Sequence, residues 1–186
     1  MTGSVGQPWV TNGGSTIHDA LAIMENYRTC EFTTVFRDGT PETWPVRSLF
    51  LRDGRLLICT SIGFPQKAFN IRRNPRVSLL FSEPTGSGLS HSGAVLICGT
   101  AVAEGRVIAD MTTSPELAAL TRTVIKRQPA SKFMSSFLGR RLFPSYYWRI
   151  AIYVTPVLGF YWRTREFAEE PESLDLKELR HVAAGK

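Results

Sequence analysis

Two hydroxyl residues and a lysine lie close together in the sequence, where a predicted strand gives way to a predicted helix. Thr60 and Ser61 end an apolar, strand-like run, and Gln66 and Lys67 begin the amphipathic segment that follows. Free backbone N–H groups, the positive end of a helix dipole and a cation would meet there, and together they suit a phosphate monoester. The spacing alone fits a solvated basic helix equally well.

Two arginines precede this junction. Arg47 and Arg52 lie five positions apart on the preceding predicted strand. That spacing puts them on opposite faces of a regular strand unless the strand bulges or ends near Asp53. The two side chains therefore need either a shared ligand or separate surfaces.

The sequence lacks the common catalytic and metal-binding motifs. There is no G-x-S-x-G elbow, H-E-x-x-H helix, phosphate-binding Walker loop, Rossmann glycine fingerprint or C-x-x-C pair. The residues without partners at metal or triad spacing are His18, His91, His181, Cys30, Cys59 and Cys98. We therefore expect no metal site and assign no catalytic side chain, so an enzyme of this sequence would use the reactivity of a cofactor.

The net charge of +6 comes from a basic body followed by an acidic tail. Such an excess of cations serves either nucleic acid or one phosphorylated ligand. Because the arginines are scattered through several predicted elements, we expect no nucleic-acid partner.

No apolar run reaches the roughly 20 residues of a membrane span, and no signal sequence opens the chain. With its odd, widely spaced cysteines, the sequence predicts a cytoplasmic protein without membrane insertion.

The elements that must position these residues are mostly short strands. The pattern predicts one domain, residues 16–165, between a loose leader (1–15) and an acidic tail (166–186). The strands are expected at 31–36, 43–51, 56–60, 76–81, 93–104, 147–155 and 157–163. Four helical regions are expected. One follows Thr16 as its N-cap, one covers 65–74, one is a helical insertion at 110–144, and one in the tail follows Ser173 as its N-cap. Asp-Gly turns after the first two strands favour hairpins, so we predict a mainly β (α+β) fold, a nearly closed antiparallel barrel with a few peripheral helices.

Three sequence stretches resemble a known flavoprotein core. They are Arg47-Ser48-Leu49-Phe50-Leu51-Arg52, residues 56–61, and the run from Gln66-Lys67 to Asn74-Pro75-Arg76-Val77-Ser78-Leu79-Leu80-Phe81. Together they resemble the flavin-binding core of the pyridoxamine 5′-phosphate oxidase-like split-barrel superfamily. The likeness covers residues 30–104 and returns at 148–162, which implies an antiparallel split β-barrel.

The resemblance also implies a set of cofactor contacts. In that family, basic residues and strand-end hydroxyl groups hold the phosphate and ribityl chain of FMN. The corresponding residues are Arg47, Ser48, Leu49, Arg52, Thr60, Ser61, Gln66 and Lys67. Gln66 replaces an arginine that is frequent in the family, Ala94 replaces the glutamine beside the isoalloxazine ring, and Trp162 matches a late aromatic residue.

The implied activity is a flavin-dependent oxidoreductase that transfers hydride between FMN and a small substrate. The family's R-x-H substrate pattern is replaced here by Arg163-Thr164-Arg165, which argues against pyridoxamine phosphate itself. One alternative is a deazaflavin-dependent reductase with extra basic surface at Arg72, Arg73, Arg140 and Arg141. Another is a non-catalytic flavin- or haem-binding module, with His91 as the candidate haem ligand. Family members are usually homodimers with flavin at the subunit interface, a role that suits the aromatic residues between 146 and 162.

Overall fold

The structure, a computed structural model, describes residues 13–90, 93–127 and 148–185. Most of the predicted leader and the second half of the 110–144 insertion lie outside the described residues. The same is true of His91, Arg140 and Arg141. Within the described residues, no helix is long and apolar enough to cross a membrane.

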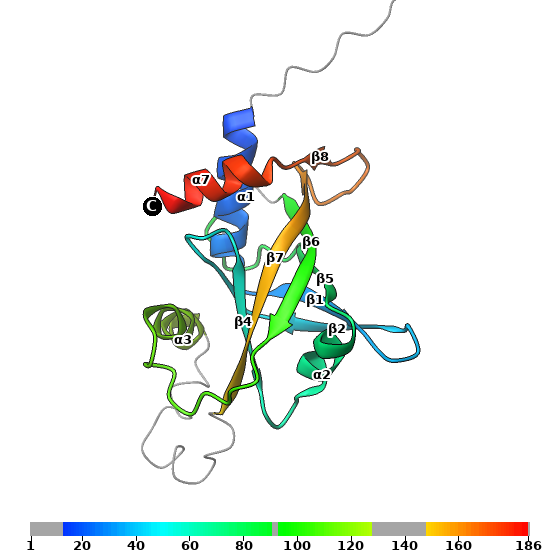
Figure 1. Ribbon diagram of the computed structural model, residues 1–186. Helices are drawn as coiled ribbons and strands as arrows, with labels where there is room; N and C mark the ends of the chain where they lie inside the picture. The colour runs from blue at the N-terminus through cyan, green and yellow to red at the C-terminus, as the bar shows by residue number, and fades with distance from the viewer. Residues whose placement is uncertain (1–12, 91–92, 128–147, 186) are drawn as a thin grey trace, which may run out of the picture.

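A single antiparallel sheet organises the chain (Figure 1). Its strands are β1 (Cys30–Val35), β2 (Pro41–Val46), β3 (Ser48–Phe50), β4 (Leu56–Ser61), β5 (Arg76–Phe81), β6 (Ala94–Ala103), β7 (Arg149–Trp162) and β8 (Glu172–Ser173). The spatial order is β2-β1-β5-β6-β7-β4-β3, and β8 pairs with β7. The sheet curls into a half-barrel, which confirms the predicted split-barrel class.

The helices described by the structure surround this sheet. They are α1 (Gly13–Asn26), α2 (Gln66–Arg73), α3 (Pro115–Arg127) and α7 (Leu176–Ala184). Figure 1 shows α1 and α7 together near one end of the sheet, with α2 beside β1 and β2 near the other. The third helix, α3, lies on the side of β3 and β4.

The predicted strand 43–51 is wrong as a single strand. The structure ends β2 at Val46 and begins β3 at Ser48, and these strands occupy opposite edges of the sheet. Arg47 alone joins them, so the chain crosses the open side of the curled sheet at this residue. This short connection brings the two edge strands of the half-barrel together at Arg47.

The two predicted final strands, by contrast, form one long strand, β7. This strand contains a β-bulge at Val157: Cys98 of β6 pairs with Leu158, whereas the next residue, Gly99, pairs with Pro156. A Cβ atom on Gly99 would lie 2.3 Å from the Thr155 carbonyl oxygen. The glycine therefore permits the two backbones to approach at the point where β7 continues unbroken.

Side chains on the two faces of the sheet enter different apolar clusters. Leu56 and Ile58 of β4 point into the barrel, where they join Tyr27, the residue that follows α1, and other core residues. Leu57, between them, points outward and packs with Leu117 of α3. The main core thus fills the barrel, and α3 covers a second, smaller cluster on its outside.

The C-terminal segment packs into the same core. Leu179 and Ala183 of α7 are buried in the main cluster, and α7 contacts both α1 and β7. Asp175 caps this helix by accepting hydrogen bonds from the N–H groups of Lys177 and Glu178. The predicted cap, Ser173, is therefore wrong, because it lies in β8 two residues earlier.

The N-terminal helix also begins earlier than predicted. Thr16 was expected to cap it, whereas α1 starts at Gly13 and includes Thr16. The Thr16 hydroxyl instead donates to Glu172 at 2.9 Å, and Glu172 also pairs with Arg163 at 2.7 Å. These contacts tie the start of α1 to the segment that leads into α7.

Candidate functional site: the β4–α2 junction

A tight loop brings the end of β4 to the start of α2. The Thr60 hydroxyl donates to the Phe64 carbonyl at 3.0 Å, and the Gly63 N–H donates to the Ser61 hydroxyl at 3.2 Å. The Phe64 N–H also donates to the Ser61 carbonyl. The two hydroxyl residues therefore order the loop, and the Ser61 hydroxyl, which accepts here, retains an O–H group to donate.

The first turn of α2 has the features of an anion site. The residue before the helix is Pro65, and no side chain caps the N–H groups of this turn. The helix dipole makes this end positive, and Lys67 adds a full positive charge within the turn. The predicted helix over 65–74 is confirmed, since α2 runs from Gln66 to Arg73 and Pro75 follows.

Lys67 is unusual because its charged side chain is buried. The residue is only 9% exposed, and its ammonium nitrogen lies 4.7 Å from the centre of the Trp44 ring. Burial lowers the pKa of Lys67 below its ordinary value of 10.5, while the nearby Glu42 carboxylate opposes this shift. A partly desolvated ammonium group is prepared to bind an anion.

A buried amide holds this end of α2 against the β1–β2 hairpin. Asn70 is fully buried, and its Nδ2 donates to the Thr34 hydroxyl at 3.0 Å and to Glu42 at 2.9 Å. Its Oδ1 accepts from Gln66 at 2.9 Å and from Arg73. The network fixes the position of the helix start relative to β1 and β2. The Gln66 amide is one of its members.

Arg47 is directed to a different place. Its guanidinium donates to the backbone carbonyls of Glu25, at 2.8 Å, and of Tyr27. These carbonyls lie at the C-terminal end of α1, where a cation also complements the helix dipole. In this structure Arg47 therefore stabilises the end of α1.

Ser48 and Leu49, the neighbours of Arg47 in the predicted set, contact other parts of the protein interior. Ser48 is 4% exposed, and its hydroxyl oxygen accepts a hydrogen bond from the Cys30 thiol at 3.6 Å. Burial raises the pKa of the Cys30 thiol to about 12, so the thiol stays protonated there. Leu49 packs on the outer cluster beneath α3.

Arg52 lies far from the β4–α2 junction along the hairpin. It is exposed in the turn between β3 and β4. Thr60 is at the other end of β4, about 13 Å from Leu56 at the usual strand rise. The structure thus gives Arg47 and Arg52 separate surfaces, one of the two arrangements that their spacing allowed.

Ala94 and Trp162 form a second group of predicted contacts. They are paired across β6 and β7, and Ala94 is fully buried. Trp162 is half-buried, and its ring centre lies 5.2 Å from that of Phe167 in an edge-on arrangement. Ser61 pairs with Arg149 at the start of β7, so the junction and Trp162 lie at opposite ends of that strand.

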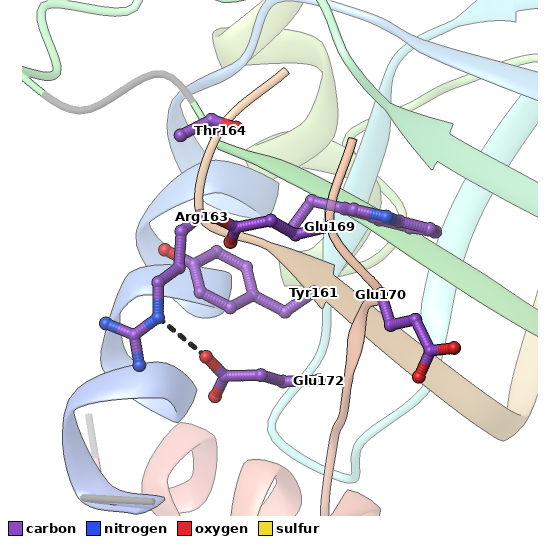
Figure 2. Close-up of a pocket in the computed structure, with 7 residues that line it drawn as sticks. Tyr161, Arg163, Thr164, Glu169, Glu170 and Glu172 are labelled. Carbon is purple, nitrogen blue, oxygen red and sulfur yellow. Dashed lines mark hydrogen bonds and ion pairs between the residues drawn. The ribbon is translucent and has the colours of Figure 1, made fainter. Parts of the chain in front are cut away.

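A small pocket adjoins Trp162 (Figure 2). Its lining residues are Tyr161, Trp162, Arg163, Thr164, Glu169, Glu170 and Glu172. Its volume of about 20 Å³ has room for about one water molecule. The pocket is too small for a flavin ring, and the Arg163–Glu172 ion pair lies across it.

The structure therefore joins four of the ten predicted contacts in one place: Thr60, Ser61, Gln66 and Lys67. It adds three residues that the sequence analysis missed, namely Glu42, Trp44 and Asn70. One signal for them was available, since Glu42 and Trp44 alternate along β2 and so share a face. Nothing in the sequence showed that this face meets α2.

A family model matches this chain, whereas no curated protein does. The family model for pyridoxamine 5′-phosphate oxidase matches residues 17–140. A comparison with curated proteins finds no significant match.

Several solved structures share the fold at low sequence identity. One is a protein related to general stress protein 26, of the pyridoxinephosphate oxidase family, from Clostridium acetobutylicum, with a TM-score of 0.53 and 11% identity over 89% of this chain and 97% of that one. Another is general stress protein 26 from Bacillus anthracis, with a TM-score of 0.50 and 17% identity over 85% and 96% of the two chains. A heme-binding protein from Mycobacterium smegmatis has a TM-score of 0.51 and 18% identity over 95% of this chain and 62% of that one. The half-barrel fold and the family-model match over two thirds of the sequence together show that this chain belongs to the pyridoxamine 5′-phosphate oxidase family.

Proposed function

We propose that the protein binds FMN through its phosphate at the β4–α2 junction and acts as a flavin-dependent oxidoreductase on a small substrate. One observation carries the proposal: Lys67, a buried cationic residue, occupies the uncapped first turn of α2, next to the loop ordered by Thr60 and Ser61. A partly desolvated cation, a helix N-terminus and hydroxyl groups are together the chemistry that recognises a phosphate monoester.

The residues present fit the phosphate end of FMN. Lys67 would supply the charge, the N–H groups of the first turn would donate along the helix axis, and Ser61 would donate from its hydroxyl. Gln66 contributes a neutral amide, already held by Asn70. The residues of this chain bind and orient the cofactor, and the flavin supplies the hydride chemistry.

We propose that the protein is a homodimer. The junction and Trp162 lie at opposite ends of β7, about 40 Å apart along the strand. A single cofactor is contacted by both only if they come from different copies. Dimerisation would therefore combine the junction of one copy with Trp162 of the other.

An exposed apolar face offers the surface for this contact. Val102 of β6 is 68% exposed, and Leu158 of β7 is 55% exposed. Both lie on the outer side of the sheet. Val102 pairs with Tyr153, which packs on the outer cluster, and Leu158 pairs with Cys98, whose neighbour Ile97 belongs to the main core. Exposed apolar side chains on one face of a sheet are typical of an interface between subunits.

Two alternative functions are also compatible with membership of this family. A deazaflavin with an anionic extension would use the same junction together with Arg72 and Arg73, both exposed at the end of α2. A non-catalytic module would bind flavin or haem without turnover. We also propose a cytoplasmic location, which suits the free thiols of Cys30, Cys59 and Cys98.

Titration of the protein, freed of bound cofactor, with FMN and with a deazaflavin tests the proposal. We expect micromolar or tighter binding of FMN, measured by quenching of flavin fluorescence, and oxidation or reduction of the bound flavin by a small-molecule donor or acceptor. Tight binding of the deazaflavin alone would favour the first alternative, and flavin binding without turnover would favour the second. Absence of binding to either cofactor would refute the proposed function.

A further inference from the structure

Trp44 lies between the buried Lys67 ammonium and solvent. The indole is 45% exposed, whereas the lysine beneath it is 9% exposed. The ammonium faces the ring at 4.7 Å from its centre, which is a favourable cation–π distance. Lys67 keeps little exposed surface and the exposed Trp44 ring covers one side of its ammonium, so an anion that approaches from this side has to displace the ring.

The position of Trp44 allows the ring to move. It lies on β2, which is an edge strand of the sheet and is mostly exposed. Glu42, two residues earlier on the same face, holds β2 to α2 through its hydrogen bond with the buried Asn70. The attachment of the hairpin to α2 is thus carried by a polar network separate from the Trp44 ring, and the ring can change rotamer while the hairpin stays in place.

We propose that Trp44 is a positioning residue that competes with the cofactor phosphate for Lys67. In the ligand-free protein the indole holds the ammonium in place and partly shields it from water. Phosphate binding replaces the ring, and the indole turns away. This inference rests on the proposed function, since it concerns the same phosphate site.

The competition has an effect opposite to that of an ordinary ligand contact. Removing the ring removes the competitor, so Trp44→Leu is expected to tighten FMN binding about two- to fivefold, the factor to which an exposed cation–π contact corresponds. Riboflavin, which lacks the phosphate, does not compete with the ring, so its affinity stays unchanged. A tryptophan that stacked on the flavin ring would give the reverse result, with weaker binding of both ligands.

The experiment compares the full-length protein with Trp44→Leu, Trp44→Phe and the control Phe69→Leu. Phe69 is also exposed and its ring lies 6.0 Å from the Arg72 guanidinium, so it matches the type of contact without touching Lys67. Affinities for FMN and riboflavin are measured by flavin fluorescence. In parallel, inorganic phosphate is titrated into the ¹⁵N-labelled protein, in which the indole N–H signal absent from Trp44→Leu identifies Trp44 among the four tryptophans.

We expect tighter FMN binding in Trp44→Leu, a smaller gain in Trp44→Phe, no change in Phe69→Leu, and a phosphate-dependent shift of the Trp44 indole signal. Unchanged or weaker FMN binding in Trp44→Leu, or an indole signal that phosphate does not move, overturns the inference while the proposed function stands. If the wild-type protein binds neither FMN nor phosphate, the proposed function is wrong and the inference falls with it.

Discussion

Replacing Lys67 with methionine separates its role in binding from its role in folding. Methionine keeps an unbranched chain of similar length and removes the charge. A charge-assisted hydrogen bond to phosphate contributes about 1.5–3 kcal/mol. The Trp44 contact that the ammonium gives up in the complex, about 0.5–1 kcal/mol, offsets part of this. The net loss of about 0.5–2.5 kcal/mol corresponds to FMN binding about 2- to 70-fold weaker.

The same substitution is expected to leave stability unchanged or to raise it. Burial of the Lys67 ammonium lowers the stability of the folded protein, as the 9% exposure of the residue and its lowered pKa indicate. An apolar side chain in that place avoids the cost but loses the contact with Trp44, so the two effects nearly cancel. We therefore expect the melting temperature of Lys67→Met to equal or slightly exceed that of the wild type.

The assay measures FMN and riboflavin affinity by flavin fluorescence and stability by thermal unfolding. Arg76→Met is the control, because it removes one exposed positive charge near the far end of α2 and should change FMN affinity less than about twofold. The reasoning is refuted if Lys67→Met binds FMN as tightly as the control does. It is also refuted if riboflavin affinity falls by the same factor as FMN affinity, because the lost contact would then not involve the phosphate.

Three further predictions follow from the same contacts. FMN affinity is expected to fall as pH rises toward 10.5, because the pKa of Lys67 is lowered and the phosphate binds the charged form of the side chain. The Lys67→Arg variant stays charged, so its FMN affinity should not change over the same pH range. Equal pH dependence of the two proteins would contradict the assignment of Lys67 to the phosphate site. Leu158→Glu should convert the proposed dimer to monomers in sedimentation velocity and weaken FMN binding, whereas Val107→Glu, a change of an exposed side chain outside the strands, should do neither. Arg47→Met should lower stability by about 1–3 kcal/mol, or roughly 2–10 °C in melting temperature, because two carbonyls at the end of α1 lose a charged donor; an unchanged melting temperature would show that these bonds contribute nothing.

The sequence could predict those parts of the fold that local chemistry determines. Both Asp-Gly turns were predicted, and Gly39 and Gly54 adopt φ of 91° and 86°, which other residues rarely tolerate. The helix before Pro75 was predicted from an equally local signal, because a proline limits where the preceding helix can end. These signals act over a few residues and do not depend on the rest of the chain.

The break at Arg47 could not be predicted in this way. Val46 and Ser48 are both buried and Arg47 is less so, which continues the alternation of a single strand. Periodicity therefore shows no interruption where β2 ends and β3 begins. The break follows from closure of the barrel, which depends on strand pairs far apart in the sequence.

The candidate site also contains one part that local sequence signals predict and one part that depends on distant contacts. Thr60, Ser61, Gln66 and Lys67 lie within eight positions, so a strand–loop–helix pattern was enough to group them. Asn70 and Glu42 are 28 positions apart and meet only in the folded sheet.

Arg47 illustrates the opposite limit of a resemblance. Its position matches a phosphate-binding arginine of the family, yet its guanidinium bonds to carbonyls about 20 positions earlier, at the end of α1. A sequence match places the backbone of such a residue, whereas the contacts of a long, flexible side chain depend on which acceptors the fold leaves within reach. Here the end of α1 supplies those acceptors.

The difference between Asn70 and Lys67 explains why the junction is suited to binding. Both residues are polar and buried on one helix, but Asn70 has its donors and acceptor matched by fixed partners from β1, β2 and α2. Lys67 has a ring and a nearby carboxylate, which compensate a buried charge less fully. The satisfied amide makes the helix start rigid, and the less satisfied ammonium keeps a favourable interaction in reserve for an anion. Replacing this lysine with an apolar residue is expected to leave stability nearly unchanged, so its contribution would lie in the proposed phosphate site rather than in folding.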